Sequence, residues 1–293
     1  MSVTWQQCVM YVIGALLIWL GIKKEYEPSL LVPMGFGAIL VNFPFTSVLD
    51  QTIQGVEAAG IIEWLFEVGI HASEAMPILL FIGIGAMIDF EPLLQRPILV
   101  LYGFAAHLGI FVAIGLALLI GFNTADAFSI GIIGAADGPT AILMSQILNS
   151  NYMGPIAVVA YSYMALIPII QPPIMKALTT KKERAVEMKQ LRKVSKTEKI
   201  IFPVVVLVIC AFILPSVAPL LGMLMLGNLF KECGVVDRLS DTAQNALMNI
   251  ITIMLGVTVG ATANGQDFLQ LKTLLIIGLG LAAFCLSTVG GVL

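Results

Sequence analysis

Charged side chains are scarce in this sequence, and their scarcity sets the class of protein. Asp, Glu, Lys and Arg make up 11% of the 293 residues, whereas soluble domains contain about 25%. Hydrophobic residues make up 59%, and the mean hydropathy is +0.99. A soluble core of this length cannot bury so much apolar surface, so lipid must be the solvent for much of the chain. The composition predicts an all-α polytopic membrane protein.

Other absences exclude whole classes of function. The four cysteines are scattered and form no CxxC or Cys/His cluster, which argues against a disulfide framework or a zinc site. The sequence contains no nucleotide-binding loop, no catalytic triad and no basic face that would bind nucleic acid. The N-terminus lacks a basic region and a small-residue cleavage site, so the first apolar run is predicted to be a retained helix.

Nine to ten hydrophobic segments follow one another along the chain. Several are shorter than the roughly 20 residues that a straight span needs, and many contain proline or glycine. Short, interrupted helices are typical of transporter cores, where irregular backbone lines a protected cavity. A further stretch, 61–70, is amphipathic and too short to cross, which predicts an interfacial helix. The candidate segments are 9–22, 29–43, 75–88, 97–121, 126–148, 154–178, 200–214, 217–230, 245–261 and 274–293.

The few positive charges are concentrated in one place. Residues 176–199 contain nine of the 15 Lys and Arg residues of the chain. The positive-inside rule places this segment in the cytoplasm, together with Lys23 and Lys24, and hence the N-terminus outside. A solvated connector is a better interpretation of this basic run than a nucleic-acid site.

Two parts of the sequence resemble each other. "PMGFGAILVN" (33–42) and "PLLGMLMLGN" (219–228) share a Pro and an Asn at the same spacing, and 85–106 parallels 260–283 in the same order. This order predicts a first membrane repeat at 1–178, a basic cytoplasmic loop at 179–199 and a second repeat at 200–293. A counterpart of Asp137 would fall beyond residue 293, so the second repeat is predicted to be C-terminally incomplete and the chain to lack the end of a longer protein.

The stretch "GIIGAADGPTA" (131–141) places an acid and two helix breakers inside an apolar segment. A charge at mid-membrane costs about 2.5–3.5 kcal/mol, and a proline inside a helix costs about 3 kcal/mol. A discontinuous helix explains both, because its freed carbonyls and half-helix ends face a cavity. Gly138 and Pro139 would form the break, and Asp137 and Thr140 would supply hard oxygen ligands for Na⁺ or a proton.

Two questions about this segment stay open from sequence alone. One interpretation is that Asp137 only caps the second half-helix as an N-cap residue, with Pro139 in its first turn; capping and ion binding are nevertheless compatible. The segment 126–148 either dips into the membrane and returns, or crosses it. We favour the re-entrant arrangement, in which the two repeats are inverted relative to each other.

Further polar residues lie in the remaining apolar segments. "YSYMALIPIIQPP" (161–173) contains Tyr161, Tyr163 and Gln171 among three prolines. A phenol there can donate a hydrogen bond or a proton, or it can mark the membrane interface. The two tyrosines point to different sides of a helix, and we select Tyr163 because it is nearer the prolines. His107 is expected in mid-helix with a satisfied imidazole, since no metal partner stands at i+4.

These motifs resemble a known family. "GAADGPTAI" and "YSYMALIPIIQPPIMKALTT", with "GIGAMIDFEPLL" (83–94) and "KKEYEPSLLVP" (23–33), are similar to the β-subunit of the sodium-translocating, biotin-dependent decarboxylases. That family serves oxaloacetate, methylmalonyl-CoA and glutaconyl-CoA decarboxylases. Two departures stand out. The family usually has Gly where Ala135 stands, and its members continue through a further helix with polar Asn and Ser ion-site residues that this chain lacks.

The resemblance implies a mechanism and a set of partners. Carboxyltransferase and biotin-carrier subunits would deliver carboxybiotin, which the β-subunit decarboxylates with consumption of a proton and export of Na⁺. Asp137 would be the essential intramembrane carboxylate, and Tyr163 would lie near the proton and ion path. A small membrane subunit, a homo-oligomeric state and a prokaryotic inner membrane are also implied.

Two other functions remain compatible with the residues themselves. A secondary transporter such as a Na⁺/H⁺ antiporter could use the same broken helix without decarboxylase chemistry. A membrane anchor with a vestigial polar core is the third possibility. The residues do not tell which acid is decarboxylated.

Overall fold

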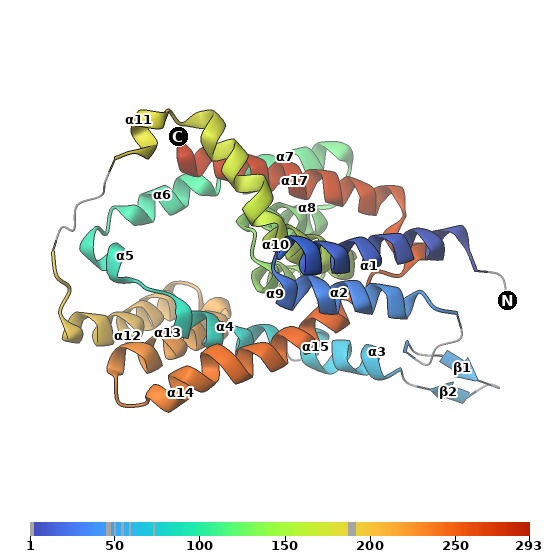
Figure 1. Ribbon diagram of the computed structural model, residues 1–293, viewed down its shortest axis with the longest axis horizontal. Helices are drawn as coiled ribbons and strands as arrows, with labels where there is room; N and C mark the ends of the chain where they lie inside the picture. Colours follow the sequence, from blue (N-terminus) through green and yellow to red (C-terminus); the bar gives the residue numbers. More distant parts are fainter. Residues whose placement is uncertain are drawn as a thin grey trace. The chain divides into compact units, whose positions relative to one another are not determined.

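The computed structural model describes residues 3–44, 48–49, 51–53, 56–58, 60–72, 74–186 and 192–293, and these are almost entirely helical (Figure 1). The helices are α1 (Trp5–Lys24), α2 (Pro28–Val41), α3 (Ile61–Phe66), α4 (Ala75–Met87), α5 (Glu91–Gln95), α6 (Leu99–Ala106), α7 (Leu108–Ile120), α8 (Thr124–Gly131), α9 (Gly138–Ile147), α10 (Met153–Leu178), α11 (Lys181–Arg184), α12 (Lys196–Ile213), α13 (Ala218–Cys233), α14 (Asp237–Thr242), α15 (Met248–Ala261), α16 (Gly265–Phe268) and α17 (Leu271–Val292). Short turns of other helix types are η1 (Glu67–His71), η2 (Ile132–Ala135), η3 (Pro215–Val217) and η4 (Ala243–Leu247). Strands β1 (Gln51–Ile53) and β2 (Val56–Ala58) form one antiparallel hairpin.

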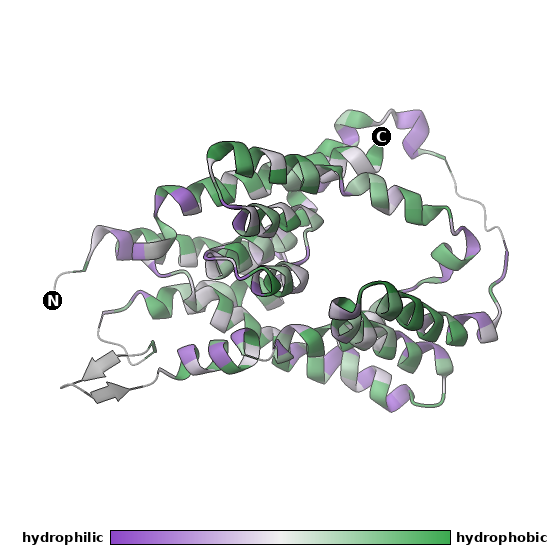
Figure 2. Ribbon diagram, turned by 180° about the vertical axis from the view of Figure 1, so that it is seen from behind, coloured by the Kyte–Doolittle hydropathy of each residue, from purple (hydrophilic) through white to green (hydrophobic). Residues whose placement is uncertain are grey.

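The prediction of an all-α polytopic membrane protein is confirmed. Each predicted hydrophobic segment falls on one or more of the helices. Hydrophobic residues cover the long helices, and hydrophilic residues gather at connectors and short helices such as α11 and α14 (Figure 2). Within the part of the chain that the structure describes, five helical stretches are long and apolar enough to cross a membrane, namely Trp5–Lys24, Leu99–Ile120, Met153–Leu178, Asp237–Ala261 and Leu271–Val292.

The chain divides into two compact units. The first comprises Met1–Glu74, Gly103–Arg184 and Ile253–Leu293, and the second comprises Ala75–Tyr102 and Ala185–Thr252. In the first unit α1 packs along α2, and α17 packs against both α7 and α10. In the second unit α13 packs along α4 and α12.

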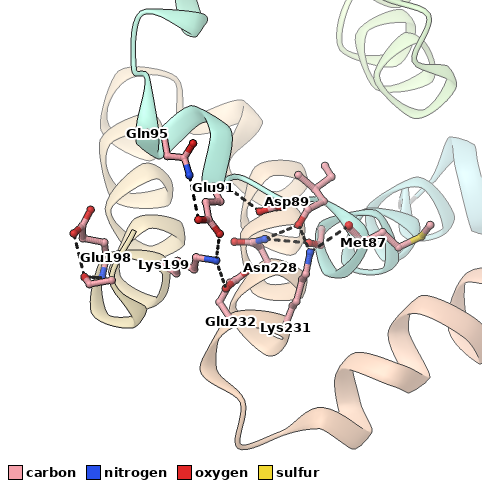
Figure 3. Close-up of polar contacts among 12 residues, drawn as sticks. Met87, Asp89, Glu91, Gln95, Glu198, Lys199, Asn228, Lys231 and Glu232 are labelled. Atoms are coloured by element: carbon pink, nitrogen blue, oxygen red, sulfur yellow. Dashed lines mark hydrogen bonds and ion pairs between the residues drawn. The ribbon is translucent and has the colours of Figure 1, made fainter. Parts of the chain in front are cut away.

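In the second unit, glycines allow helices α4 and α13 to pack closely. A Cβ atom at Gly85 would collide with the Leu224 carbonyl, and one at Gly227 would collide with the Ile82 carbonyl. Small residues at such positions let two backbones touch, which is the main source of helix association in lipid. The buried Asn228 then donates from its side-chain amide to the carbonyls of Gly85 and Ile88, at 3.3 and 3.2 Å (Figure 3).

Charged residues secure one end of the same unit (Figure 3). Lys231 Nζ donates to the Ile88 carbonyl at 2.9 Å, so a cation lies at the C-terminus of α4, where the helix dipole favours it. Lys199 at the start of α12 pairs with Glu91 of α5 and lies 3.9 Å from Glu232 of α13. These contacts tie the end of the basic segment to the ends of three helices.

The first unit contains a contact of the same kind. Asn42 is 1% exposed, and its side-chain amide donates to the carbonyls of Ala38 and Ala263, each at 2.8 Å. Its side-chain oxygen accepts the Gly265 amide at 2.8 Å. Asn42 and Asn228 are the residues that the two similar sequence stretches share. Such paired contacts support a duplicated architecture, and the division into repeats at 1–178 and 200–293 stays a prediction.

The glycine contacts in the second unit lead to a stability prediction. We expect Gly85→Ala to lower the stability of the folded protein by about 1–3 kcal/mol, because the added methyl group must push α4 away from α13. Gly115→Ala is the matched control, since no atom lies within 4 Å of a Cβ built there; it should be neutral or stabilising by about 0.5–1 kcal/mol. Thermal unfolding in detergent measures both. Equal melting temperatures for the two variants would contradict the close packing.

Candidate functional site

The segment 126–148 is a hairpin whose two ends lie next to each other. Asp126, in the first turn of α8, accepts hydrogen bonds from Ser150 Oγ at 2.8 Å and from the Asn151 amide at 2.9 Å. Ser150 and Asn151 follow directly after α9, so α9 returns the chain to the level at which α8 began. The structure therefore agrees with the re-entrant arrangement of 126–148.

The tip of the hairpin lies at Ala136 and Asp137. Ala136 has a left-handed backbone with φ 54°, and Asp137 is extended with φ −127° and ψ 105°. α9 begins at Gly138 with Pro139 in its first turn, where the missing N–H of proline costs nothing because that group would have no partner in the helix. The break between η2 and α9 thus falls at Ala136 and Asp137, whereas Gly138 and Pro139, which were expected to form it, make the first turn of α9.

Asp137 occupies the N-cap position of α9 but makes no side-chain capping hydrogen bond to the helix backbone. Its carboxylate instead accepts a hydrogen bond from the Thr140 hydroxyl. Asp137 and Thr140 thus form one polar pair at the tip, as the motif predicted.

A cavity of about 660 Å³ opens at this pair and lies within the first unit. Apolar residues of η2, α7, α10 and α17 form most of its wall, with few polar groups between them. Three of the predicted site residues, Asp137, Thr140 and Gln171, line the cavity together. Sequence reasoning did not identify the other polar residues of the lining, which are His107, Ser287 and Thr288.

Helix α10 relates the cavity to the basic segment of the chain. The cavity is lined by the second half of this helix, through Ile167, Gln171 and Met175, and α10 ends at Leu178 beside the basic segment. The positive-inside rule assigns that end to the cytoplasm. The same rule predicts that the hairpin begins and ends on the opposite side, with its tip toward the cytoplasmic half, and this orientation stays a prediction.

The two tyrosines occupy different environments. Tyr161 is 1% exposed, and its ring lies so close to Gly138 that a Cβ there would approach it to 2.6 Å. Its hydroxyl has no hydrogen-bond partner among the described residues. Tyr163 donates its hydroxyl to the Ile277 carbonyl at 2.6 Å and is not part of the cavity lining. Tyr161 is thus the tyrosine beside the break, and the assignment of Tyr163 to the ion path stays a prediction.

The segment expected at 97–121 is present as the spanning stretch Leu99–Ile120, with a one-residue turn inside it. His107 separates α6 from α7, and its ring Nδ1 lies 2.5 Å from the Gly103 carbonyl. Because a carbonyl only accepts, Nδ1 is the donor and carries a hydrogen. The imidazole is satisfied, as expected, but it also borders the cavity of Asp137, which its position in an apolar run did not reveal.

The family is decided by comparison with known proteins. A family model described as the Na⁺-transporting oxaloacetate decarboxylase beta subunit matches residues 6–293. The chain belongs to this family. It is 52% identical to the methylmalonyl-CoA decarboxylase subunit beta of Propionigenium modestum, over 97% of this chain and 76% of that one. It is 50% identical to the glutaconyl-CoA decarboxylase subunit beta of Acidaminococcus fermentans, over 99% and 75%. It is also 45% identical to the oxaloacetate decarboxylase beta chain of Klebsiella pneumoniae, over 98% and 78%.

Membership in the Na⁺-transporting decarboxylase family confirms the resemblance read from the motifs. The protein is a β-subunit that couples decarboxylation to Na⁺ export, and it is a multi-pass protein of a prokaryotic inner membrane. It acts with partner subunits, in a mechanism that uses sodium and depends on biotin. The secondary-transporter alternative is not favoured.

Proposed function

We propose that Na⁺ and H⁺ compete for Asp137, and that this competition couples the decarboxylation of carboxybiotin to Na⁺ export. The observation that carries the proposal is the position of Asp137. Its carboxylate lies at the tip of a re-entrant hairpin, next to the Thr140 hydroxyl and in a cavity bordered by Gln171. Carboxylate, hydroxyl and amide oxygens are the hard ligands that suit a small cation.

The chemistry explains why one site can serve both ions. Decarboxylation breaks the N–C bond of carboxybiotin and releases CO₂, and the ring nitrogen takes up one proton. If that proton is supplied only when Na⁺ leaves Asp137, the free energy of decarboxylation is released only with ion movement. Moving one charge against 100 mV costs about 2.3 kcal/mol, which a decarboxylation can supply.

The remaining residues receive supporting roles. Gly138 leaves room for the Tyr161 ring, and Pro139 starts α9 at the right place to present Asp137. The Tyr161 hydroxyl is buried beside the tip, so its oxygen is a candidate ligand of the ion and its O–H a candidate donor to the carboxylate. Tyr163 fixes α10 against α17 through the hydrogen bond from its hydroxyl to the Ile277 carbonyl.

The partners follow from the same scheme. A carboxyltransferase subunit and a biotin carrier bring carboxybiotin to the cytoplasmic opening of the cavity, and a small membrane subunit and further β-subunits complete the complex. Relatives named for methylmalonyl-CoA, glutaconyl-CoA and oxaloacetate decarboxylases are similar to this chain to nearly the same degree. The choice of acid therefore belongs to the carboxyltransferase and not to this subunit.

The test is a reconstitution of the whole complex in liposomes. We expect ²²Na⁺ uptake only while carboxybiotin is being decarboxylated, and we expect avidin to stop both because it sequesters biotin. The pH gradient alone should drive no exchange. Avidin-insensitive Na⁺ movement driven by a pH gradient would instead identify a secondary antiporter.

A further inference from the structure

Ser287 of α17 carries a buried hydroxyl group. The residue is 7% exposed, and its Oγ has no hydrogen-bond partner among the described residues. Hydroxyls in membrane helices usually bond to the carbonyl four residues earlier, and the adjacent Thr288 does so with Phe284 at 3.0 Å. Burying a hydroxyl without a partner is unfavourable. Such an oxygen is expected to have a partner outside the described residues.

The position of Ser287 indicates what that partner is. Ser287 borders the same cavity as Asp137 and Thr140. Its Oγ lies 3.1 Å from the place where a Cβ of Gly134 would be, and Gly134 also lines the cavity, three residues before Asp137. The hydroxyl therefore lies against η2, the segment that leads into Asp137.

We propose that the Ser287 hydroxyl is a ligand of the Na⁺ held at Asp137 and makes the site selective for Na⁺ over H⁺. This inference rests on the proposed function of Asp137. A proton binds to one carboxylate oxygen, whereas a hard cation requires several oxygens around it. A neutral oxygen from α17 thus stabilises the Na⁺-bound state and adds little to the protonated state. Through this ligand a bound Na⁺ also connects α17 to the hairpin tip.

A competing explanation makes a different prediction. Ser287 also lies against Gly109 of α7, where a Cβ would collide with the Ser287 backbone and side chain. Under this explanation Ser287 is present only because a small residue lets α17 approach α7. Alanine is equally small, so under this explanation Ser287→Ala would leave Na⁺ binding unchanged.

The experiment measures Na⁺ binding apart from decarboxylation. The purified complex is heated in NaCl or in choline chloride at equal ionic strength, and the Na⁺ concentration that gives half of the thermal stabilisation is determined. Ser287→Ala should raise this concentration about tenfold, because one ligand to a charged group is lost. Its melting temperature in choline chloride should not fall, since the variant removes an unpaired hydroxyl; Ser287→Gly removes the same oxygen and serves as a second variant.

Ser145→Ala is the matched control. Ser145 is 0% exposed, and its hydroxyl is equally without a partner among the described residues, but it does not line the cavity. The Na⁺ concentration that gives half of the thermal stabilisation should be the same in Ser145→Ala as in the wild type. An unchanged requirement in both Ser287 variants, with Na⁺ stabilisation lost in Asp137→Asn, would overturn the role of Ser287 alone. Retention of Na⁺ stabilisation in Asp137→Asn would overturn both proposals.

Discussion

Asp137→Asn is expected to lower Na⁺-dependent decarboxylation of carboxybiotin at least a hundredfold. The amide keeps the shape of the carboxylate and can still accept the hydrogen bond from Thr140, but it carries no charge to hold Na⁺ and cannot exchange a proton at neutral pH. Release of CO₂ from the carboxylated carrier, with and without Na⁺, measures the effect. Because burying a charge in the membrane is costly, the variant should be as stable as the wild type or more so.

The decisive control is assembly. The variant complex should be retained on avidin through its biotin carrier to the same extent as the wild type, so that lost activity reports on the site and not on missing subunits. Asp137→Glu keeps the charge but moves it by one methylene group, and it should retain part of the Na⁺ response. Wild-type rates in a fully assembled Asp137→Asn complex would end the proposal that the two ions meet at this carboxylate.

Local sequence was enough to predict the broken segment, because each cause is local. An acid, two glycines and a proline within "GAADGPT" are each unfavourable in a continuous membrane helix. The structure interrupts the helix at Ala136 and Asp137 for those reasons. The positions of the apolar helices followed from hydropathy in the same way.

Residues whose role depends on tertiary contacts could not be predicted from their neighbours in the sequence. Ser287 is one of several hydroxyls on apolar helices, and nothing in its neighbours tells that its oxygen faces Gly134 of another segment. Sequence alone did not tell which of Tyr161 and Tyr163 lies beside the break, because two residues on one helix differ only in which neighbour each faces; the ion-path role of Tyr163 stays a prediction. The repeat gave a better signal: Asn42 and Asn228 were matched in sequence, and each donates to a carbonyl just beyond the end of a neighbouring helix, Ala263 after α15 and Ile88 after α4.

Asp126→Asn is expected to lower the stability of the protein and to leave its response to Na⁺ unchanged, which is the opposite of the result expected for Asp137→Asn. The Asp126 carboxylate is 3% exposed and accepts four hydrogen bonds, from Asn123 Nδ2, Ser150 Oγ, and the backbone and side-chain amides of Asn151, at 2.7, 2.8, 2.9 and 3.4 Å. An amide at this position turns one acceptor into a donor that faces other donors. We expect a loss of about 3 kcal/mol in the stability of the hairpin, seen as a lower melting temperature of the complex.

A graded series separates this explanation from general damage to the fold. Ser150→Ala removes one of the four donors and leaves the carboxylate with three, so it should cost only about 1 kcal/mol. In both variants the folded fraction should need the same Na⁺ concentration as the wild type, because Asp126 lies at the base of the hairpin and does not border the cavity. If Asp126→Asn were no less stable than Ser150→Ala, the base would not be what holds the hairpin closed. If instead it abolished the Na⁺ response at full stability, the ion pathway would have to include the base as well as the tip.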